Sequence, residues 1–105
     1  MNNPPLVSAL VSVYNGEDFL GKAMESLINQ TYKNIEIIII NDGSTDQSEE
    51  IIRSYMQKDE RIILINNNEN IGISRSLNKG LRKARGKYIA RLDADDIALP
   101  ARIQN

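Results

Sequence analysis

The chain has 105 residues, of which 41% are apolar and 26% are charged. This length suits one compact domain with a single core, and the composition is that of a folded protein rather than a disordered one. Thirteen basic and fourteen acidic residues give a formal net charge of -1, so no overall field favours nucleic acid or an anionic membrane, and partners must be recognised locally.

Strand-like and helix-like segments alternate from the start of the chain. Leu6 to Val13 predicts a strand that is apolar on both faces, as is typical of a parallel sheet. Glu17 to Gln30 predicts the first helix, because apolar residues recur there at helical spacing. Ile35 to Ile40 predicts the second strand, and Asn41 to Asp46 form a turn rich in residues that bond their own backbone.

The second helix is expected to start at Asp46 and to end near Lys58. Glu49 follows Asp46 by three positions, which predicts a capping box at the helix start. The third strand is expected at Ile62 to Ile65.

The third helix is expected after Gly72, with Gly86 as its C-cap. Gly80 lies inside this helix and costs about 1 kcal/mol relative to alanine, so the helix needs tertiary support. Tyr88 to Leu92 predicts the fourth strand. Ile97 to Asn105 begin a further helical segment, which suggests that the chain is a fragment.

Four strands that alternate with helices over short connections predict an α/β protein with an open parallel sheet and right-handed crossovers. Helices on both faces would give three layers, as in Rossmann-like folds. The longest aliphatic run, Ile37 to Ile40, is far shorter than the roughly 20 residues that cross a membrane. Met1 to Pro5 lack the features of a secretory signal. We therefore expect a cytoplasmic protein, either free or peripheral to the inner face of the membrane.

The residue types available limit the chemistry of any site. Cysteine and histidine are both absent, which excludes disulfides, thiol nucleophiles, imidazole bases and nearly every structural zinc site. Carboxylates are left for metal binding or proton transfer.

Polar clusters follow three of the predicted strands: Tyr14 to Glu17, Asn41 to Gly43, and Asp93 to Asp96. Ligands of open α/β sheets collect at the carboxyl ends of the strands, so all three clusters are expected on one rim. The third cluster holds three carboxylates in four residues, whose repulsion calls for a cation. Oxygen ligands suit Mg²⁺ or Mn²⁺, which complete their shells with water and phosphate oxygens. The alternative is a solvated turn in which one aspartate caps the next helix.

Three further residues have two interpretations each. Asp42 is placed to accept a hydrogen bond from a ribose hydroxyl or a base N–H, or to serve only the turn before the second helix. Tyr14 would stack on a base or simply pack. Arg75 would meet a phosphate or be an exposed helical charge.

Other nucleotide sites lack their motifs. No Gly-x-Gly-x-x-Gly follows the first strand and no Gly-Lys-Ser/Thr occurs, which excludes the common dinucleotide and P-loop cradles. The acidic cluster lacks the glycine and closing glutamate of an EF-hand. A phosphotransferase with an aspartate nucleophile would normally carry its acidic pair after the first strand, not the fourth.

Several short motifs occur in a fixed order: Val11 to Asn15, Ser26-Leu27 with Gln30-Thr31, Ile38 to Asp46, Asn70 to Gly72 with Asn78 to Leu81, and Ala84 to Ile89 leading into Leu92 to Asp96. Together they resemble the family 2 glycosyltransferases of the GT-A fold over nearly the whole chain. The resemblance implies strand order 3-2-1-4 and a nucleotide-diphosphate-sugar donor at the rim, most commonly a UDP-sugar.

The resemblance also implies roles for individual residues. Val13 and Tyr14 would line the base, Glu17 would lie close by, and Asp42 would bind the base or ribose.

On the diphosphate side, the resemblance implies that Asp93 reaches the ribose. Asp95 would hold the Mn²⁺ or Mg²⁺ ion that bridges the diphosphate, and Arg75 would be a further donor contact.

Members of the family usually invert the anomeric centre with a carboxylate base, and the segment that carries the base lies beyond Asn105. Residues 1–105 are thus predicted to be the donor-binding part of a glycosyltransferase that serves cell-envelope polysaccharide synthesis, inactive alone and with an unknown acceptor. The alternative is a noncatalytic nucleotide-binding module on the same fold. Apolar surface left exposed on the fourth strand and third helix predicts a homodimer.

Overall fold

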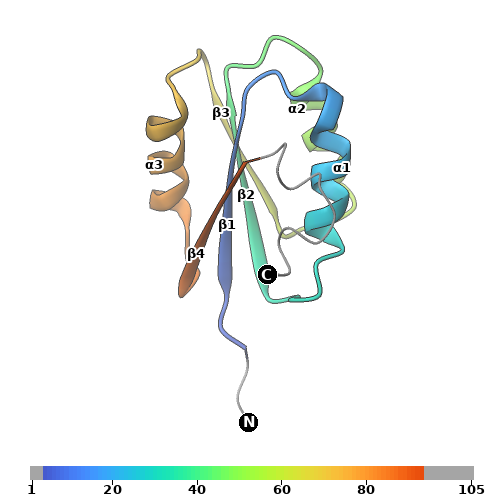
Figure 1. The fold of residues 1–105 in the computed structure, drawn as a ribbon, viewed down its shortest axis with the longest axis vertical. Coiled ribbons are helices and arrows are strands. Elements are labelled where there is room, and N and C mark those ends of the chain that lie inside the picture. The colour runs from blue at the N-terminus through green and yellow to red at the C-terminus, as the bar shows by residue number, and fades with distance from the viewer. Residues whose placement is uncertain (1–3, 94–105) are drawn as a thin grey trace.

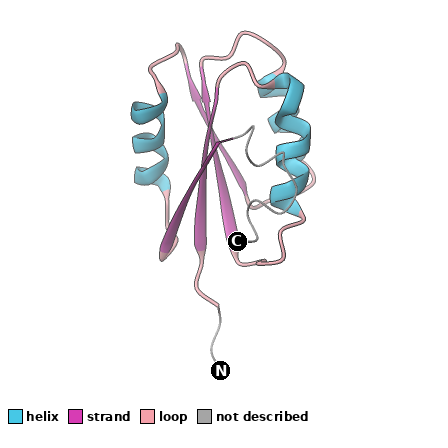
Figure 2. Cartoon of the chain, in the orientation of Figure 1, coloured by secondary structure: helices cyan, strands magenta, loops and turns pink. Residues whose placement is uncertain are grey.

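The computed structural model describes the backbone of residues 4–93 and the side chains of residues 4–92. Strands and helices alternate along this part of the chain (Figure 1; Figure 2). The elements are β1 (Val7–Val13), α1 (Glu17–Ile28), β2 (Ile35–Asp42), α2 (Ser48–Met56), β3 (Ile62–Asn67), α3 (Ile73–Lys83) and β4 (Tyr88–Asp93). The predicted α/β class is confirmed, whereas the helix expected after Pro100 lies outside the described residues.

The four strands form one parallel sheet in the order β3-β2-β1-β4, as the resemblance implied. Val7 of β1 is opposite Ile35 of β2 on one side and opposite Tyr88 of β4 on the other. Helices α1 and α2 cover one face of the sheet and α3 covers the other (Figure 1). The result is the expected three-layer arrangement.

The core has one part on each face of the sheet. Between the sheet and α1 and α2, the buried side chains include Leu20, Met24 and Ile52. Between the sheet and α3, Leu10, Ile38 and Ile40 pack against partly buried side chains of α3 and β3. All eight residues of β2 are buried, which explains its run of isoleucines. Each such side chain contributes about 1.5–3 kcal/mol by leaving water.

Gly80 lets α3 approach the sheet closely. A Cβ atom at this position would lie 2.9 Å from Cδ1 of Ile40 and 3.3 Å from Cδ2 of Leu10. The glycine is therefore explained by close packing, which is the tertiary support that its low helix propensity requires.

The predicted capping box at the start of α2 is wrong. The carboxylate of Asp46 accepts the N–H of Ser48 at 2.9 Å and the N–H of Glu17, at the start of α1, at 3.1 Å. Glu49 does not reach back to Asp46 but pairs with Arg53 one turn later, at 2.8 Å. Asp46 thus serves two helix starts at once, a contact that local spacing cannot predict.

The predicted C-cap at Gly86 is also wrong, since α3 ends at Lys83 and the chain turns into an extended conformation at Ala84. The N–H of Gly86 donates to Oγ of Ser8 at 2.8 Å. A Cβ atom at Gly86 would lie 2.6 Å from the backbone nitrogen of Ser8 and 2.5 Å from its Oγ. Gly86 is needed for close contact with β1, not for helix termination.

The buried carboxylate of Glu36, on β2, connects the segment before β4 to β1 and β2 by hydrogen bonds. Oε2 of Glu36 accepts the hydroxyl of Ser8 at 2.5 Å and the N–H of Arg85 at 2.7 Å. Burial alone would raise the pKa of Glu36, but these two hydrogen bonds and the charge of Arg85 outweigh it and hold the pKa below 4.5. Ionised Glu36 is therefore part of what positions β4.

This arrangement predicts a loss of stability in acid. Because the pKa of Glu36 is lower in the folded state, its contribution is complete above about pH 4.5 and is lost as the pH falls through the folded-state value. We expect Glu36→Gln to lower the free energy of unfolding at pH 7 and to flatten its decline below pH 4.5. Urea titrations at several pH values measure both quantities. An unchanged pH profile in the variant would show that other carboxylates carry the acid sensitivity.

Within residues 4–93, β4 is the last strand on its side of the sheet, and it leaves large side chains in solvent. Tyr88 is 55% exposed and Ile89 is 41% exposed. We expect the chain to self-associate through this edge, because exposed edge strands and apolar patches promote pairing. Sedimentation velocity over a range of concentrations measures the association, and Tyr88→Ser/Ile89→Ser should reduce it. A concentration-independent monomer would contradict the expectation.

Within residues 4–93, every helix is too short or too polar to cross a membrane.

Candidate functional site

The carboxyl ends of the strands meet at one edge of the sheet. In the strand register, Val13 is opposite Asn41, Ser12 is opposite Asp93, and Asp42 is opposite Asn67. The expected convergence of the strand ends on one rim is thus confirmed for the backbone. The loops that follow these strands form the candidate site.

The loops after β1 and β2 are joined by hydrogen bonds. The N–H of Asn15 donates to Oγ of Ser44 at 2.9 Å, and Oδ1 of Asn15 accepts the N–H of Thr45 at 2.8 Å. The N–H of Gly16 donates to Oγ of Ser48, also at 2.9 Å. Asn15 has a φ of 50°, a left-handed conformation that asparagine tolerates better than most residues. These contacts hold the two loops in one fixed shape.

Glu17 is part of the same connection. Its backbone N–H bonds Asp46, and its own Oε1 accepts the N–H of Gln47 at 2.9 Å. The two carboxylates therefore cap the starts of α1 and α2 reciprocally, where negative charge is also favoured by the helix dipoles. The structure places Glu17 at the rim, where one of its carboxylate oxygens already accepts a hydrogen bond. Its predicted position beside the nucleotide base stays a prediction.

The Asp42 carboxylate accepts three hydrogen bonds at the rim. It is 2% exposed. Its Oδ1 accepts Nδ2 of Asn67 at 2.9 Å and the N–H of Ile71 at 2.8 Å, and its Oδ2 accepts the N–H of Gly72 at 3.0 Å. Burial alone would raise the pKa of Asp42, but these hydrogen bonds outweigh it and lower the pKa below its usual value. Asp42 thus fixes the loop before α3, rather than the turn before α2.

The bonds around Asp42 extend into α3. Nδ2 of Asn67 also lies 3.0 Å from Oγ of Ser76, and Oδ1 of Asn67 accepts Nζ of Lys79 at 2.7 Å. Asn67, Ser76 and Lys79 are not among the site residues predicted from the sequence. The sequence hints at them only through the polar end of β3 at Asn67. The residues that Asn67 bonds, Asp42 and Ser76, lie 25 and 9 positions away from it.

Gly43 marks the closest approach between the loop after β2 and the loop after β3. It has a φ of 71°, and a Cβ atom there would lie 2.5 Å from the backbone nitrogen of Asn70 and 2.5 Å from the carbonyl carbon of Glu69. Gly72 also has a positive φ, 97°, but a Cβ atom there would meet nothing within 4 Å. The rim is therefore packed tightly at Gly43 and open at Gly72.

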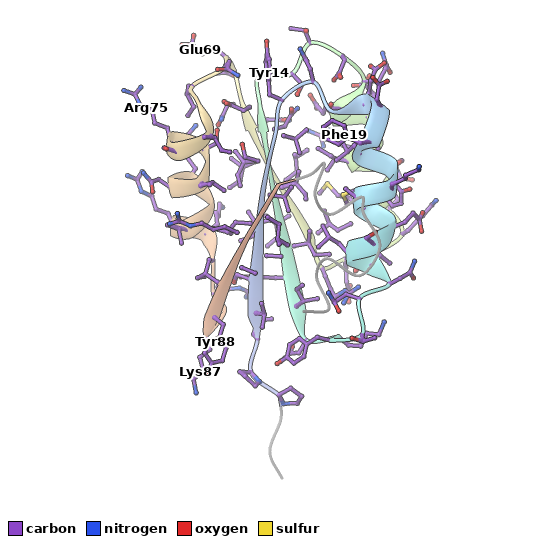
Figure 3. All side chains as sticks on the ribbon, viewed as in Figure 1. Tyr14, Phe19, Glu69, Arg75, Lys87 and Tyr88 are labelled. Atoms are coloured by element: carbon purple, nitrogen blue, oxygen red, sulfur yellow. The ribbon has the colours of Figure 1, made fainter. Side chains whose placement is uncertain are left out.

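The other predicted donor contacts differ in exposure. Tyr14 is 52% exposed, whereas Val13 is 2% exposed and offers a ligand little but its backbone. In Figure 3, Tyr14 and Arg75 lie at the same end of the molecule, and the side chain of Arg75 points outward from α3. The structure therefore brings Tyr14 to the rim with about half of its surface exposed, whereas Arg75 would have to turn inward to reach a ligand there.

The sequence profile of glycosyl transferase family 2 matches residues 8–105 of the chain. The chain belongs to this family. Its relatives include an uncharacterised glycosyltransferase of Haemophilus influenzae, 50% identical over 104 residues, which cover 99% of this chain and 32% of that protein. An uncharacterised glycosyltransferase of Methanocaldococcus jannaschii is 51% identical over 102 residues, 95% of this chain and 35% of that protein. The chain spans about a third of the length of either relative.

Solved structures of GT-A glycosyltransferases share the fold. The mannosyltransferase PcManGT of Pyrobaculum calidifontis, in complex with GDP-Man and Mn²⁺, superposes with a TM-score of 0.86 at 26% identity, covering 95% of this chain and 30% of that one. S. aureus TarS 1-349 in complex with UDP gives a TM-score of 0.78 at 27% identity, covering 85% and 27%. The family's GT-A fold is therefore present here in its strand order and its layers.

The metal-binding residues expected for this family member lie at the limit of the described chain. Asp93 ends β4 at the rim, with its side chain outside the described residues, and Asp95 lies outside them altogether. Among the side chains of residues 4–92, no group of three or more carboxylates is placed to hold an ion. In the sequence, Asp93 is followed by Asp95 and Asp96, and carboxylate oxygens are the ligand type that a hard divalent ion prefers.

An amide at the rim has an unused acceptor. Asn41 is 3% exposed, and its Nδ2 donates to Oδ1 of Asn66 at 3.0 Å. Within the described part of the chain, its Oδ1 has no hydrogen-bond partner. Asn41 was predicted as part of a turn and of the polar cluster at the rim, without a role of its own.

Proposed function

We propose that the chain is the donor-binding part of a metal-dependent glycosyltransferase, which transfers a sugar from a nucleotide-diphosphate sugar to an acceptor hydroxyl. The observation that carries the proposal is the convergence of the ends of β1, β2 and β4 on one rim of a GT-A fold. The GDP-Man complex of PcManGT and the UDP complex of TarS support a nucleotide donor, and a UDP-sugar is the donor that we propose.

The proposed base site uses the residues after β1 and the end of β2. Tyr14, half exposed at the rim, stacks on the base, and the backbone at Val13 borders it. Three of the roughly four acceptor positions of the Asp42 carboxylate are used within the protein, and the side chain is 2% exposed. A ribose or base donor would therefore reach the fourth position only when the loop before α3 moves. Glu17 keeps Oε2 for a nearby donor. Both carboxylates would then position loops and contact the ligand.

The proposed diphosphate site lies at the end of β4. Asp93 reaches the ribose, and Asp95 holds Mn²⁺ or Mg²⁺, with Arg75 turning inward as a phosphate contact. When bound, the ion supplies Lewis-acid neutralisation of the charge on the departing nucleoside diphosphate. The Mn²⁺ in the complex of PcManGT supports this choice of ion. We propose an inverting reaction in the whole protein.

We propose that residues 1–105 bind the sugar donor but do not transfer the sugar on their own. The second candidate is a noncatalytic nucleotide-binding module, which the extensive internal bonding of Asp42 and Glu17 would suit equally well. Transfer activity in the longer protein separates the two: a transferase loses turnover when Asp95 is replaced, whereas a module has no turnover to lose.

Calorimetric titration with UDP and GDP, with and without Mn²⁺, tests the proposal on the chain itself. We expect binding that requires Mn²⁺ in the parent chain and is lost in Asp95→Ala, while Asp18→Ala, on the exposed first turn of α1, binds as the parent does. Binding that needs neither Mn²⁺ nor Asp95 would remove the metal from the proposed function.

A further inference from the structure

The end of the sheet at which the strands begin, opposite the rim, is strongly basic. Five cationic side chains are exposed there, at the amino ends of the strands and the end of α3, and we call them the basic edge: Lys33, Arg82, Lys83, Arg85 and Lys87. Arg61 lies at the same edge, but its charge is matched by Asp59 at 2.7 Å. Glu60 is an exposed acid nearby, and the buried Glu36 pairs with Arg85 at 3.5 Å, so Lys33, Arg82, Lys83 and Lys87 outnumber the remaining acid. The basic edge therefore keeps a clear positive excess in a chain whose net charge is -1.

Apolar and aromatic side chains stand beside these cations. Tyr88 and Ile89 are the exposed residues at the start of β4, and Nζ of Lys87 lies 5.8 Å from the centre of the Tyr88 ring. Figure 3 shows Lys87 and Tyr88 at the end of the molecule opposite Tyr14. Basic residues next to an exposed tyrosine and an aliphatic side chain are typical of surfaces that dock on anionic membranes.

A cavity of about 340 Å³ opens at the same edge, lined in part by Lys33, Glu36, Arg61 and Arg85. In the described part of the chain, Oε1 of Glu36 is buried and accepts no hydrogen bond, and the nearest charge is Nε of Arg85 at 3.5 Å. Among the described bonds, neither Nζ of Lys33 nor the terminal nitrogens of Arg85 have an acceptor. The cavity thus holds two cationic donors, Lys33 and Arg85, beside a buried Glu36 oxygen that is ion-paired with Arg85 but accepts no hydrogen bond.

This combination fits a phosphate group that carries hydroxyls. The phosphate oxygens would accept from Lys33 and Arg85, and a hydroxyl would donate to Oε1 of Glu36. A phosphoglycerol unit supplies both groups and is small enough for a cavity at the lower end of ligand-site volumes. The backbone of DNA has phosphates but no hydroxyl donor, so it would leave the Glu36 oxygen unpaired.

We propose that the basic edge docks on an anionic membrane, with a phosphoglycerol lipid headgroup in the cavity beside Glu36. The rim at the other edge is rich in acids, including Glu17, Asp46 and Glu69, and is repelled by the same surface. Docking therefore orients the molecule, with the strand carboxyl ends directed away from the lipid. This proposal does not depend on what the rim binds.

Vesicle co-sedimentation tests the proposal. We expect the chain to bind phosphatidylglycerol vesicles at low salt, to bind phosphatidylcholine vesicles weakly, and to be released at high salt. Lys83→Gln/Lys87→Gln removes two exposed cations and should weaken binding by about thirty-fold, because each cation contributes about 1 kcal/mol near an anionic surface. The charge-matched control Lys22→Gln/Arg53→Gln, on α1 and α2, should bind as the parent chain does.

A second variant addresses the cavity. Arg85→Gln should weaken binding to phosphatidylglycerol vesicles, because it removes one of the two cationic donors proposed to hold the headgroup phosphate. Equal binding to neutral vesicles, or an equal loss in the control, would overturn membrane docking. Binding of free glycerol phosphate without vesicle binding would identify a soluble phosphate ligand instead, and retention of an oligonucleotide without vesicle binding would identify a nucleic-acid surface. Either result would contradict the proposal.

Discussion

Gly43→Ala is expected to lower the free energy of unfolding by about 4 kcal/mol, the largest effect of any single methyl group that we expect in this chain. Two costs add at this position. The new Cβ would lie 2.5 Å from backbone atoms of Glu69 and Asn70, which cannot turn away as a flexible side chain can. The φ of 71° also places any L-residue other than glycine in the left-handed region.

Gly72→Ala is the matched control, because it has the positive φ without the contact. We expect it to cost about 1–2 kcal/mol, the price of the left-handed conformation alone. Urea unfolding of both variants measures the difference, which isolates the contact between the loops after β2 and β3. Equal losses in the two variants would mean that these loops separate easily and that the rim is not held by this contact.

Asp42→Ala is the second large effect, expected at about 3–5 kcal/mol. The substitution removes one of the two acceptors of the buried Nδ2 of Asn67 and the acceptor of the part-buried N–H groups of Ile71 and Gly72. Each buried donor without a partner costs about 1–3 kcal/mol, and the freed loop recovers part of this by reaching water. Urea unfolding at pH 7 measures the loss.

Two variants determine the source of that loss. Asp42→Asn keeps the shape of the side chain but offers one acceptor oxygen to three donors, so we expect about half of the alanine effect. Ser54→Ala removes an exposed hydroxyl that bonds only the carbonyl of Ile51, and it should cost less than about 0.5 kcal/mol. If Asp42→Ala cost as little as Ser54→Ala, Asp42 would not be what fixes the loop before α3.

The fold was predictable because its elements are set by local pattern. The isoleucine run of β2 and the helical spacing of Leu20, Ala23, Met24 and Leu27 require no knowledge of the rest of the chain. The strand order came from the family resemblance, and the register confirms it. The sequence also located the rim, since polar residues directly follow buried strands there.

The contacts within the rim were not predictable, because they join residues far apart in the sequence. Asp46 bonds Glu17 across 29 positions, and Asp42 bonds Ile71 across the same span. Local motifs therefore suggested a capping box at Asp46 and a turn residue at Asp42, whereas each carboxylate in fact binds another loop. The ligand contact of Asp42 stays a prediction. Gly86 shows the same limit, since its partner Ser8 lies 78 positions away.

The proposed function requires that a nucleotide and a metal ion bind together at the carboxyl ends of the strands. Paramagnetic broadening of backbone amide signals by Mn²⁺, in the presence of UDP, measures the position of the ion directly. We expect the signals of Tyr14, Asn15 and Gly43 to broaden, and those of Arg61 and Lys87 at the opposite edge to stay sharp. Broadening centred on Arg61 and Lys87, with a sharp signal from Tyr14, would contradict the account.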